Sequence, residues 1–174
     1  MEESNTANNN SKNFFEKIGI FVPGYIGYAV REGRRETDKL LRDNFARILY
    51  EKKRILDEVM LAMTNAHKLG VLNDLDRIKK KLEKVIDRIK YASHGASGVF
   101  DVVQIKEKEL EVLYKYDLSL AESINQFSSR IEIIKDILQK DEKEIKSFAN
   151  ELTDILNQFD KNLDSRNRCI QDVK

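Results

Sequence analysis

The chain has 174 residues and a formal net charge of +1, with one cysteine, one proline and no tryptophan. This near-balance of charge argues against a nucleic-acid partner, and the lone Cys169 excludes an intrachain disulfide and favours a reducing, cytoplasmic location. Hydrophobic residues make up 41% of the chain and charged residues 35%, a balance typical of an elongated helical bundle rather than a compact α/β enzyme.

Residues 1–13 are polar and rich in asparagine. Such a segment cannot bury enough apolar surface to offset the entropy of ordering it, so a disordered tail is predicted. It also lacks the basic start, the apolar stretch and the cleavage site of a signal peptide.

Residues 14–29 form an apolar segment, and thirteen uncharged residues run from Ile18 to Val30. A helix that spans a bilayer needs about 20 apolar residues, and Pro23 and three glycines interrupt this run. Two roles stay open. The segment caps the end of the bundle, which is slightly favoured because apolar segments usually join their own core, or it docks on a membrane or a partner. Its candidate anchors are Phe14, Phe15, Ile18, Phe21, Tyr25 and Tyr28.

The first long helix is predicted from about Val30 to Lys68, and residues 30–170 are expected to form the bundle. Its apolar stripe repeats every three or four residues, which is the period of a helix. The stripe reads Leu41, Phe45, Ile48, Lys52, Ile55, Val59, Ala62, Ala66 and Leu69, with Leu49, Leu56 and Met63 beside it. Gly70 stands where a left-handed helix cap is expected, and Asn73 or Asp74 can cap the start of the next helix.

A second helix follows with the stripe Val71, Leu75, Ile78, Leu82, Val85 and Ile89. The short link between the two helices predicts an antiparallel hairpin. Residues 93–98, which contain Gly95 and Gly98, mark a break. A short helix is then predicted over 101–115 and a kink near Asp117, where Ser119 and Glu122 have the spacing of a capping box.

One continuous helix is predicted from the kink to about Ile170, with residues 171–174 frayed. Eleven of twelve stripe positions in it are apolar, and only Asp141 interrupts them; the stripe reads Leu120, Ile124, Phe127, Ile131, Ile134, Leu138, Asp141, Ile145, Phe148, Leu152, Ile155 and Phe159. A helix with such a stripe needs a neighbour to cover it. The fold class is therefore all-α: an elongated, antiparallel, coiled-coil-like bundle of three long helices and one short one.

Two rows of basic residues stand out on the predicted helices. The first row is Arg31, Arg35, Lys39 and Arg42, which shares one face that is expected in water. Because this row follows the apolar segment, the two together match the two signals of a peripheral membrane binder. The second row, Arg77, Lys81, Lys84 and Arg88, flanks the stripe of its helix. Pairing with acidic residues of the last helix is the favoured explanation for it.

The charge is also uneven along the chain. Residues 1–98 carry 19 Lys and Arg against 14 Asp and Glu, whereas residues 99–174 carry 12 against 16. The favoured interpretation is that the two halves pack together with complementary flanks, and the alternative is a basic half that faces an anionic partner.

No pattern of catalytic or metal-binding residues emerges. Neither His67 nor His94 follows a Glu-x-x-His spacing, and residues 95–98 lack the ending of a phosphate-binding loop. We therefore expect no enzyme activity, no metal and no cofactor.

The predicted function is that of a non-catalytic helical interaction or scaffold protein, with protein partners and self-association through its heptad stripes. The alternative is a peripheral membrane protein of the membrane-stress or membrane-organising type, which would use residues 14–42 at the inner face of the membrane. The plan of an apolar segment before a helical hairpin resembles, in architecture and without a shared motif, the scaffolds of the phage-shock kind. That resemblance implies only the membrane alternative.

Overall fold

Long helices build almost all of the part of the chain that the computed structural model describes, namely residues 16–25, 33–91, 107–137 and 139–171. Four of them form a bundle: α2 (Arg34–Asn65), α3 (Leu72–Tyr91), α5 (Glu107–Glu132) and α7 (Glu142–Gln171). Two short elements lie at their ends, the 3₁₀ turn η2 (Leu69–Val71) and α6 (Ile134–Ile137). Within these residues no strand occurs, which confirms the predicted all-α bundle.

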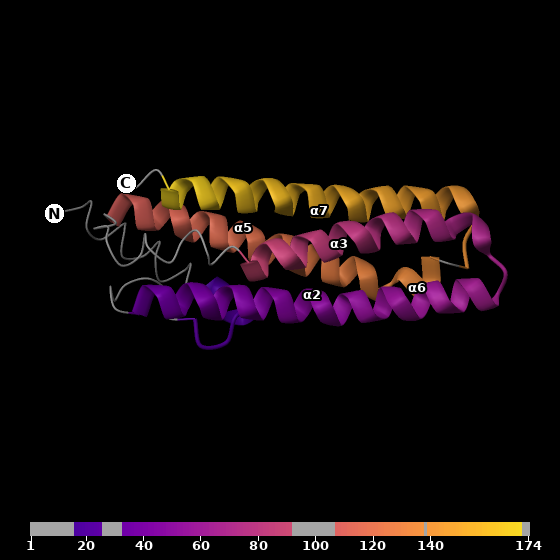
Figure 1. Cartoon of the computed structure of the whole chain (residues 1–174), viewed down its shortest axis with the longest axis horizontal. Coiled ribbons are helices and arrows are strands. Elements are labelled where there is room, and N and C mark those ends of the chain that lie inside the picture. The colour runs from indigo at the N-terminus through magenta and orange to yellow at the C-terminus, as the bar shows by residue number, and fades with distance from the viewer. Residues whose placement is uncertain (1–15, 26–32, 92–106, 138, 172–174) are drawn as a thin grey trace.

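The bundle consists of two antiparallel hairpins, α2–α3 and α5–α7, laid side by side (Figure 1). Each helix packs on two others, in the cyclic order α2, α3, α7 and α5. Ion pairs fix the directions across the two hairpins. Lys52 pairs with Glu132, and Arg166 joins Asp38 to Asp117, so α2 and α5 run parallel. Figure 1 shows both chain reversals at one end of the bundle and the starts of α2 and α5 at the other.

The apolar stripes meet in a single core. All six stripe residues of the second helix are buried, as are ten of the twelve in the stripe that starts at Leu120. The first stripe is buried near its start, at Leu41 and Phe45, and its last three residues, Ala62, Ala66 and Leu69, are exposed. Periodicity therefore predicted most of the inward faces of the helices correctly, and apart from this exposed end of the first stripe the stripes cover one another within one chain.

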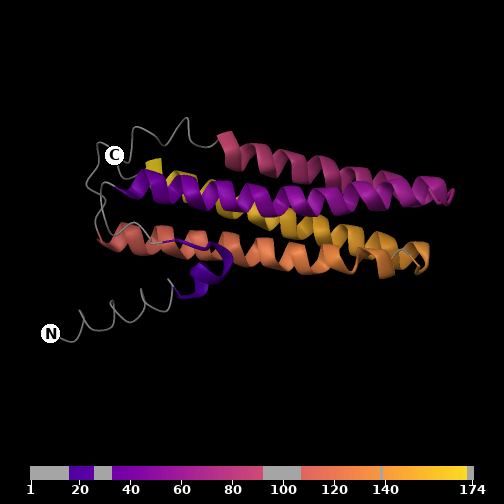
Figure 2. The same ribbon diagram turned by 90° about the horizontal axis from the view of Figure 1, so that it is seen from below.

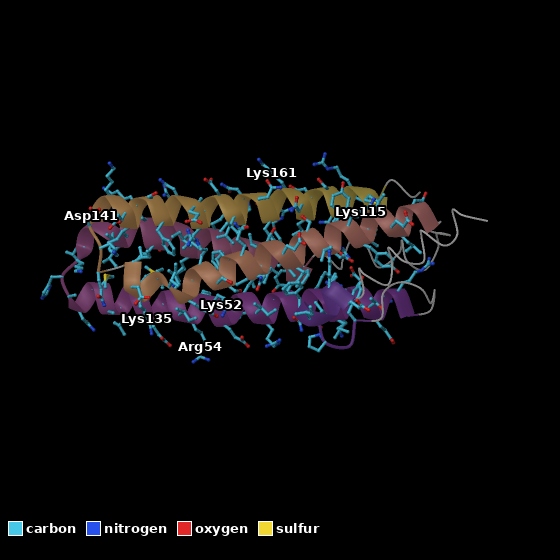
Figure 3. All side chains as sticks on the ribbon, turned by 180° about the vertical axis from the view of Figure 1, so that it is seen from behind. Lys52, Arg54, Lys115, Lys135, Asp141 and Lys161 are labelled. Atoms are coloured by element: carbon cyan, nitrogen blue, oxygen red, sulfur yellow. The ribbon has the colours of Figure 1, made fainter. Side chains whose placement is uncertain are left out.

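The continuous helix expected over 117–170 is wrong, because the chain reverses between Ile133 and Asp141. Asp117 lies inside α5, which runs unbroken from Glu107 to Glu132, so residues 107–115 of the helix predicted over 101–115 are the first part of α5, and residues 101–106 lie outside the described residues. Asp141 precedes α7 and accepts a hydrogen bond of 2.8 Å from the backbone N–H of Glu144. This is an N-cap, and Figure 3 shows Asp141 at the end of the bundle where α7 begins. The bundle thus has four long helices instead of three.

The turn between α2 and α3 also differs from the prediction. The left-handed residue is His67, with φ 54°, whereas Gly70 lies in the turn η2. The N–H of Lys68 bonds to the carbonyl of Met63, and the N–H of His67 bonds to that of Thr64. This pair of bonds is the Schellman motif. Asn73 and Asp74, predicted to cap α3, lie within its first turn.

Ion pairs between the two halves of the chain confirm the interpretation of the uneven charge. Basic residues of α2 and α3 pair with acidic residues of α5 and α7, for example Lys52 with Glu132 and Lys81 with Asp160. Pairs in the opposite sense also occur, such as Lys135 with Glu58. The two hairpins therefore meet with complementary flanks.

Several predictions fall on residues outside the described part of the chain. These are the disordered tail over 1–13, the break over 93–98 with His94, the stripe residue Leu138 and the frayed end over 172–174.

Candidate functional site

Charged side chains are buried at the end of the bundle where α2 and α5 begin; Arg34, the first residue of α2, is one of them, and four others contact one another. Asp38 and Arg42 come from α2, Asp117 from α5 and Arg166 from α7, and none of the four is more than 9% exposed. Arg166 joins the two carboxylates, with Nε 2.5 Å from Oδ1 of Asp117 and Nη2 2.7 Å from Oδ1 of Asp38. Nε of Arg42 donates to the other oxygen of Asp38 at 2.8 Å.

Two further contacts extend this buried ionic network. The hydroxyl of Tyr25 donates to Oδ2 of Asp117 at 3.3 Å, so both oxygens of that carboxylate are engaged. Nη1 of Arg42 lies 3.5 Å from the carbonyl oxygen of Ile89, in the last turn of α3. A helix end leaves its last carbonyls without partners inside the helix. The network therefore ties the end of α3 to the three other long helices.

Two carboxylates and two guanidinium groups contact one another in this network. An isolated buried charge is costly, and such groups are tolerated when they are paired and hydrogen-bonded. The contacts of Arg166 with Asp38 and Asp117, and of Arg42 with the carbonyl of Ile89, cross between helices and therefore depend on the register of those helices. The arrangement is typical of a structural role.

Sequence reasoning missed this network, although a signal for it was present. Asp38, Asp117 and Arg166 each stand in phase with the apolar stripe of their own helix, three or four residues from Leu41, Leu120 and Leu163. A charged residue at a stripe position points into the core. Two such acids and one such base, each on a different helix, indicate a buried ion pair.

The apolar segment is divided between the core and the surface. Ile18 and Val22 are fully buried, Tyr25 is 7% exposed, and Phe21 packs partly against the core. Ile20 points outward and is 78% exposed. The predicted anchors Phe14, Phe15 and Tyr28 lie outside the described residues. For residues 16–25 the structure thus shows a segment folded over the bundle (Figure 2).

The first basic row does not share a water-facing side. Arg42 is buried and paired with Asp38, which is a correction of the predicted face. Arg35 and Lys39 are exposed, and Arg31 lies outside the described residues. The error has a simple cause: α2 is flanked on two sides by helices and covered by residues 16–25, so less of its circumference reaches water than a single stripe suggests.

Lys81 and Arg88 of the second basic row pair with acidic residues of α7, as predicted, whereas Lys84 is exposed. Lys81 and Arg88 both contact Asp160, and Arg88 also contacts Asp164. Arg77 bonds to Asn150, which also lies on α7, at 2.9 Å. Burial by itself would raise the pKa of Asp160, but the hydrogen bond from Lys81 and the charges of Arg88 and Lys81 outweigh it, and the pKa is lowered.

A shallow hollow on α2 and the end of α3 was not predicted. It has a volume of about 340 Å³ and is lined by Asp43, Ala46, Arg47, Tyr50, Glu51, Arg54 and Lys90. Nζ of Lys90 lies 4.4 Å from the ring centroid of Tyr50 and donates to its hydroxyl at 3.1 Å. That hydrogen bond raises the pKa of Lys90. Tyr50 is 40% exposed and the neighbouring Tyr91 67%.

The described residues contain no group of three or more His, Cys, Asp or Glu side chains placed to hold a metal ion. Among the same residues, no helix combines the length and the apolar character needed to cross a bilayer.

Comparisons with known proteins add no relative. No family model, no curated protein and no solved structure matches the chain.

Proposed function

We propose that the chain is a non-catalytic helical interaction protein that binds a protein partner through the hollow around Tyr50. The observation that carries this proposal is an exposed tyrosine, with Lys90 over its ring, on the α2–α3 hairpin. Tyr and Arg are enriched where protein interfaces gain most of their binding energy, and the hollow offers Tyr50, Arg47 and Arg54. A cytoplasmic location, proposed from the lone Cys169, accompanies this function.

Self-association is part of the proposal, although the stripes are largely covered inside the chain. The exception is the end of the first stripe near the α2–α3 turn, where Leu69 is 60% exposed and Leu61 of the same hairpin is 63% exposed. A second copy would bury these side chains. Size-exclusion chromatography with light scattering measures the mass of the assembly, which can be compared with the 20.3 kDa of one chain.

A photo-crosslinking side chain at Arg54 tests the proposed surface. Arg54 lines the hollow and extends away from the bundle (Figure 3). The matched control is the same crosslinker at Lys161, an exposed residue of α7. In a lysate of the source cells, we expect a defined crosslinked protein from position 54 only, and its loss when Tyr50→Glu is added. Equal products from both positions, or products that survive Tyr50→Glu, would contradict the proposal.

The membrane alternative has one observation in its favour, the outward-facing Ile20 on the segment over 16–25. Co-sedimentation of the same full-length protein with anionic liposomes at low and high salt separates the two functions. The protein-binding proposal requires the chain to stay in the supernatant. The membrane function would be favoured instead if the chain pelleted with the liposomes, if Ile20→Asp abolished this pelleting, and if high salt weakened it.

A further inference from the structure

Residues 16–25 place three inward-facing side chains on the bundle with the spacing of an amphipathic helix. Ile18, Val22 and Tyr25 stand at positions i, i+4 and i+7 and join the main core, while Ile20 faces water. The segment lies against α5 and α2 (Figure 2): Tyr25 bonds to Asp117 of α5, and Gly24 lies near Leu40 of α2. It is therefore a separate piece of chain laid over a bundle that is already closed by four helices.

A tight turn over residues 22–25 positions the side chain of Tyr25. The N–H of Tyr25 bonds to the carbonyl of Val22 at 3.1 Å, and Gly24 between them has φ +83°. Proline at the second position of a β-turn and a glycine with positive φ at the third are the signature of a type II turn. Pro23 and Gly24 thus end the helical turn over 16–21 and direct the Tyr25 hydroxyl towards Asp117.

We propose that residues 16–25 act as a releasable latch, which the Tyr25–Asp117 hydrogen bond closes over the α2–α5 side of the bundle. Three buried side chains must offset the loss of conformational freedom of ten residues. The long helices bury several times as many side chains as the segment does. The latch therefore opens by a local fluctuation that leaves the bundle folded.

Opening has a defined consequence for the ionic network. Oδ2 of Asp117 loses its tyrosine donor, while Arg166 keeps its bond to Oδ1. The buried carboxylate and the apolar side chains beneath Ile18 and Val22 then meet water. The latch rests on the contacts of residues 16–25 and not on the Tyr50 hollow, so it stands whether or not that hollow binds a partner.

Native-state hydrogen exchange on the full-length chain tests the latch. The reporter is the N–H of Val22, which bonds to the carbonyl of Ile18 at 2.8 Å, and the reference amides are those of Leu82 and Leu152 in the core. We expect Val22 to exchange at least about 100-fold faster than the references, at a rate that low concentrations of urea do not change. Exchange of Val22 together with the core amides, at one common free energy, would overturn the latch.

Three variants test the closing contacts. Tyr25→Phe removes only the hydroxyl, and Gly24→Ala strains the positive φ of the turn, although the nearest atom to the new Cβ would be 3.9 Å away. Tyr25→Phe should speed the exchange of Val22 by about tenfold, the ratio expected for the loss of one hydrogen bond. Gly24→Ala should speed it by a similar factor, because a positive φ is strained for a residue with a Cβ. The core amides should be unaffected by either change. Gly19→Ala, where nothing lies within 4 Å of the new Cβ, is the control and should not speed it. If all three variants exchange alike, the turn and the hydroxyl do not hold the segment.

Discussion

Replacing Arg166 by methionine is expected to cost about 3–5 kcal/mol of unfolding free energy, because it leaves two buried carboxylates without their shared cation. Arg166 is 2% exposed and is the group that joins Asp38 to Asp117. Urea denaturation measures the loss as a lower midpoint. The double variant Asp117→Leu with Arg166→Met should lose less than the two single changes combined, because it also removes one of the unpaired charges.

The control for this experiment is a solvent-exposed ion pair on the protein surface. Arg47 and Glu51 pair at 2.9 Å with side chains 60% and 55% exposed, and such pairs contribute only about 0–1 kcal/mol. Arg47→Met should therefore change stability little. A loss from Arg166→Met that is no larger than the loss from Arg47→Met would show that the buried network does not hold the four helices in register.

Replacing Ile134 by aspartate is expected to unfold the protein or to cost roughly 3 kcal/mol or more, since it places an unpaired charge in a dry core. Ile134 is 1% exposed and belongs to α6, which lies between α5 and α7. Thermal unfolding followed by circular dichroism measures the effect. The neighbouring change Lys135→Asp is the control, because Lys135 is 65% exposed and only 3.7 Å from Glu58 in a surface pair. Equal tolerance at the two positions would mean that the buried face of this turn is assigned wrongly.

Helical periodicity predicted which side chains are buried, but it did not predict where the chain reverses. The stripe keeps its phase from Ile131 through Ile134 to Ile145, although residues 139–141 between α6 and α7 are not helical. The phase of an apolar stripe indicates which face of a helix is buried, but it does not indicate the direction in which the chain runs. No glycine or proline occurs between Glu132 and Glu142 to mark the reversal, and it is closed by short-range backbone bonds such as that from Lys140 to Ile137.

Two signals in the sequence could have revealed the hairpin. Asp141 interrupts the stripe three residues before Glu144, which is the spacing of a helix N-terminus. An unbroken helix over 117–170 would also span roughly 80 Å, far beyond any neighbour, whereas α2 and α7 span about 48 and 45 Å at the helical rise per residue. Matching helix lengths favours two hairpins over one very long helix.

The candidate sites could be predicted only in part, for reasons of geometry. The apolar character of residues 14–29 was evident, yet its division into the buried Ile18 and the exposed Ile20 depends on which helices it covers. The hollow around Tyr50 depends on where α3 ends beside α2 and places Lys90 over the ring. Both features depend on contacts between residues that are far apart in the sequence.

The structure shows one chain forming a closed bundle in which α5 and α7 are an antiparallel hairpin. Spin labels at Ser129→Cys and Asp154→Cys, with Cys169→Ser to remove the native thiol, test it directly, because both positions are exposed. The labels lie on adjacent helices near the Arg130–Glu151 ion pair, and helices in contact lie about 8–10 Å apart. In a sample diluted with excess unlabelled protein, electron–electron resonance should give a distance below about 25 Å, which allows for the reach of the two labels beyond that helix spacing. A distance near 38 Å, as expected for 25 residues of one continuous helix, or a short distance that disappears on dilution, would contradict the claim.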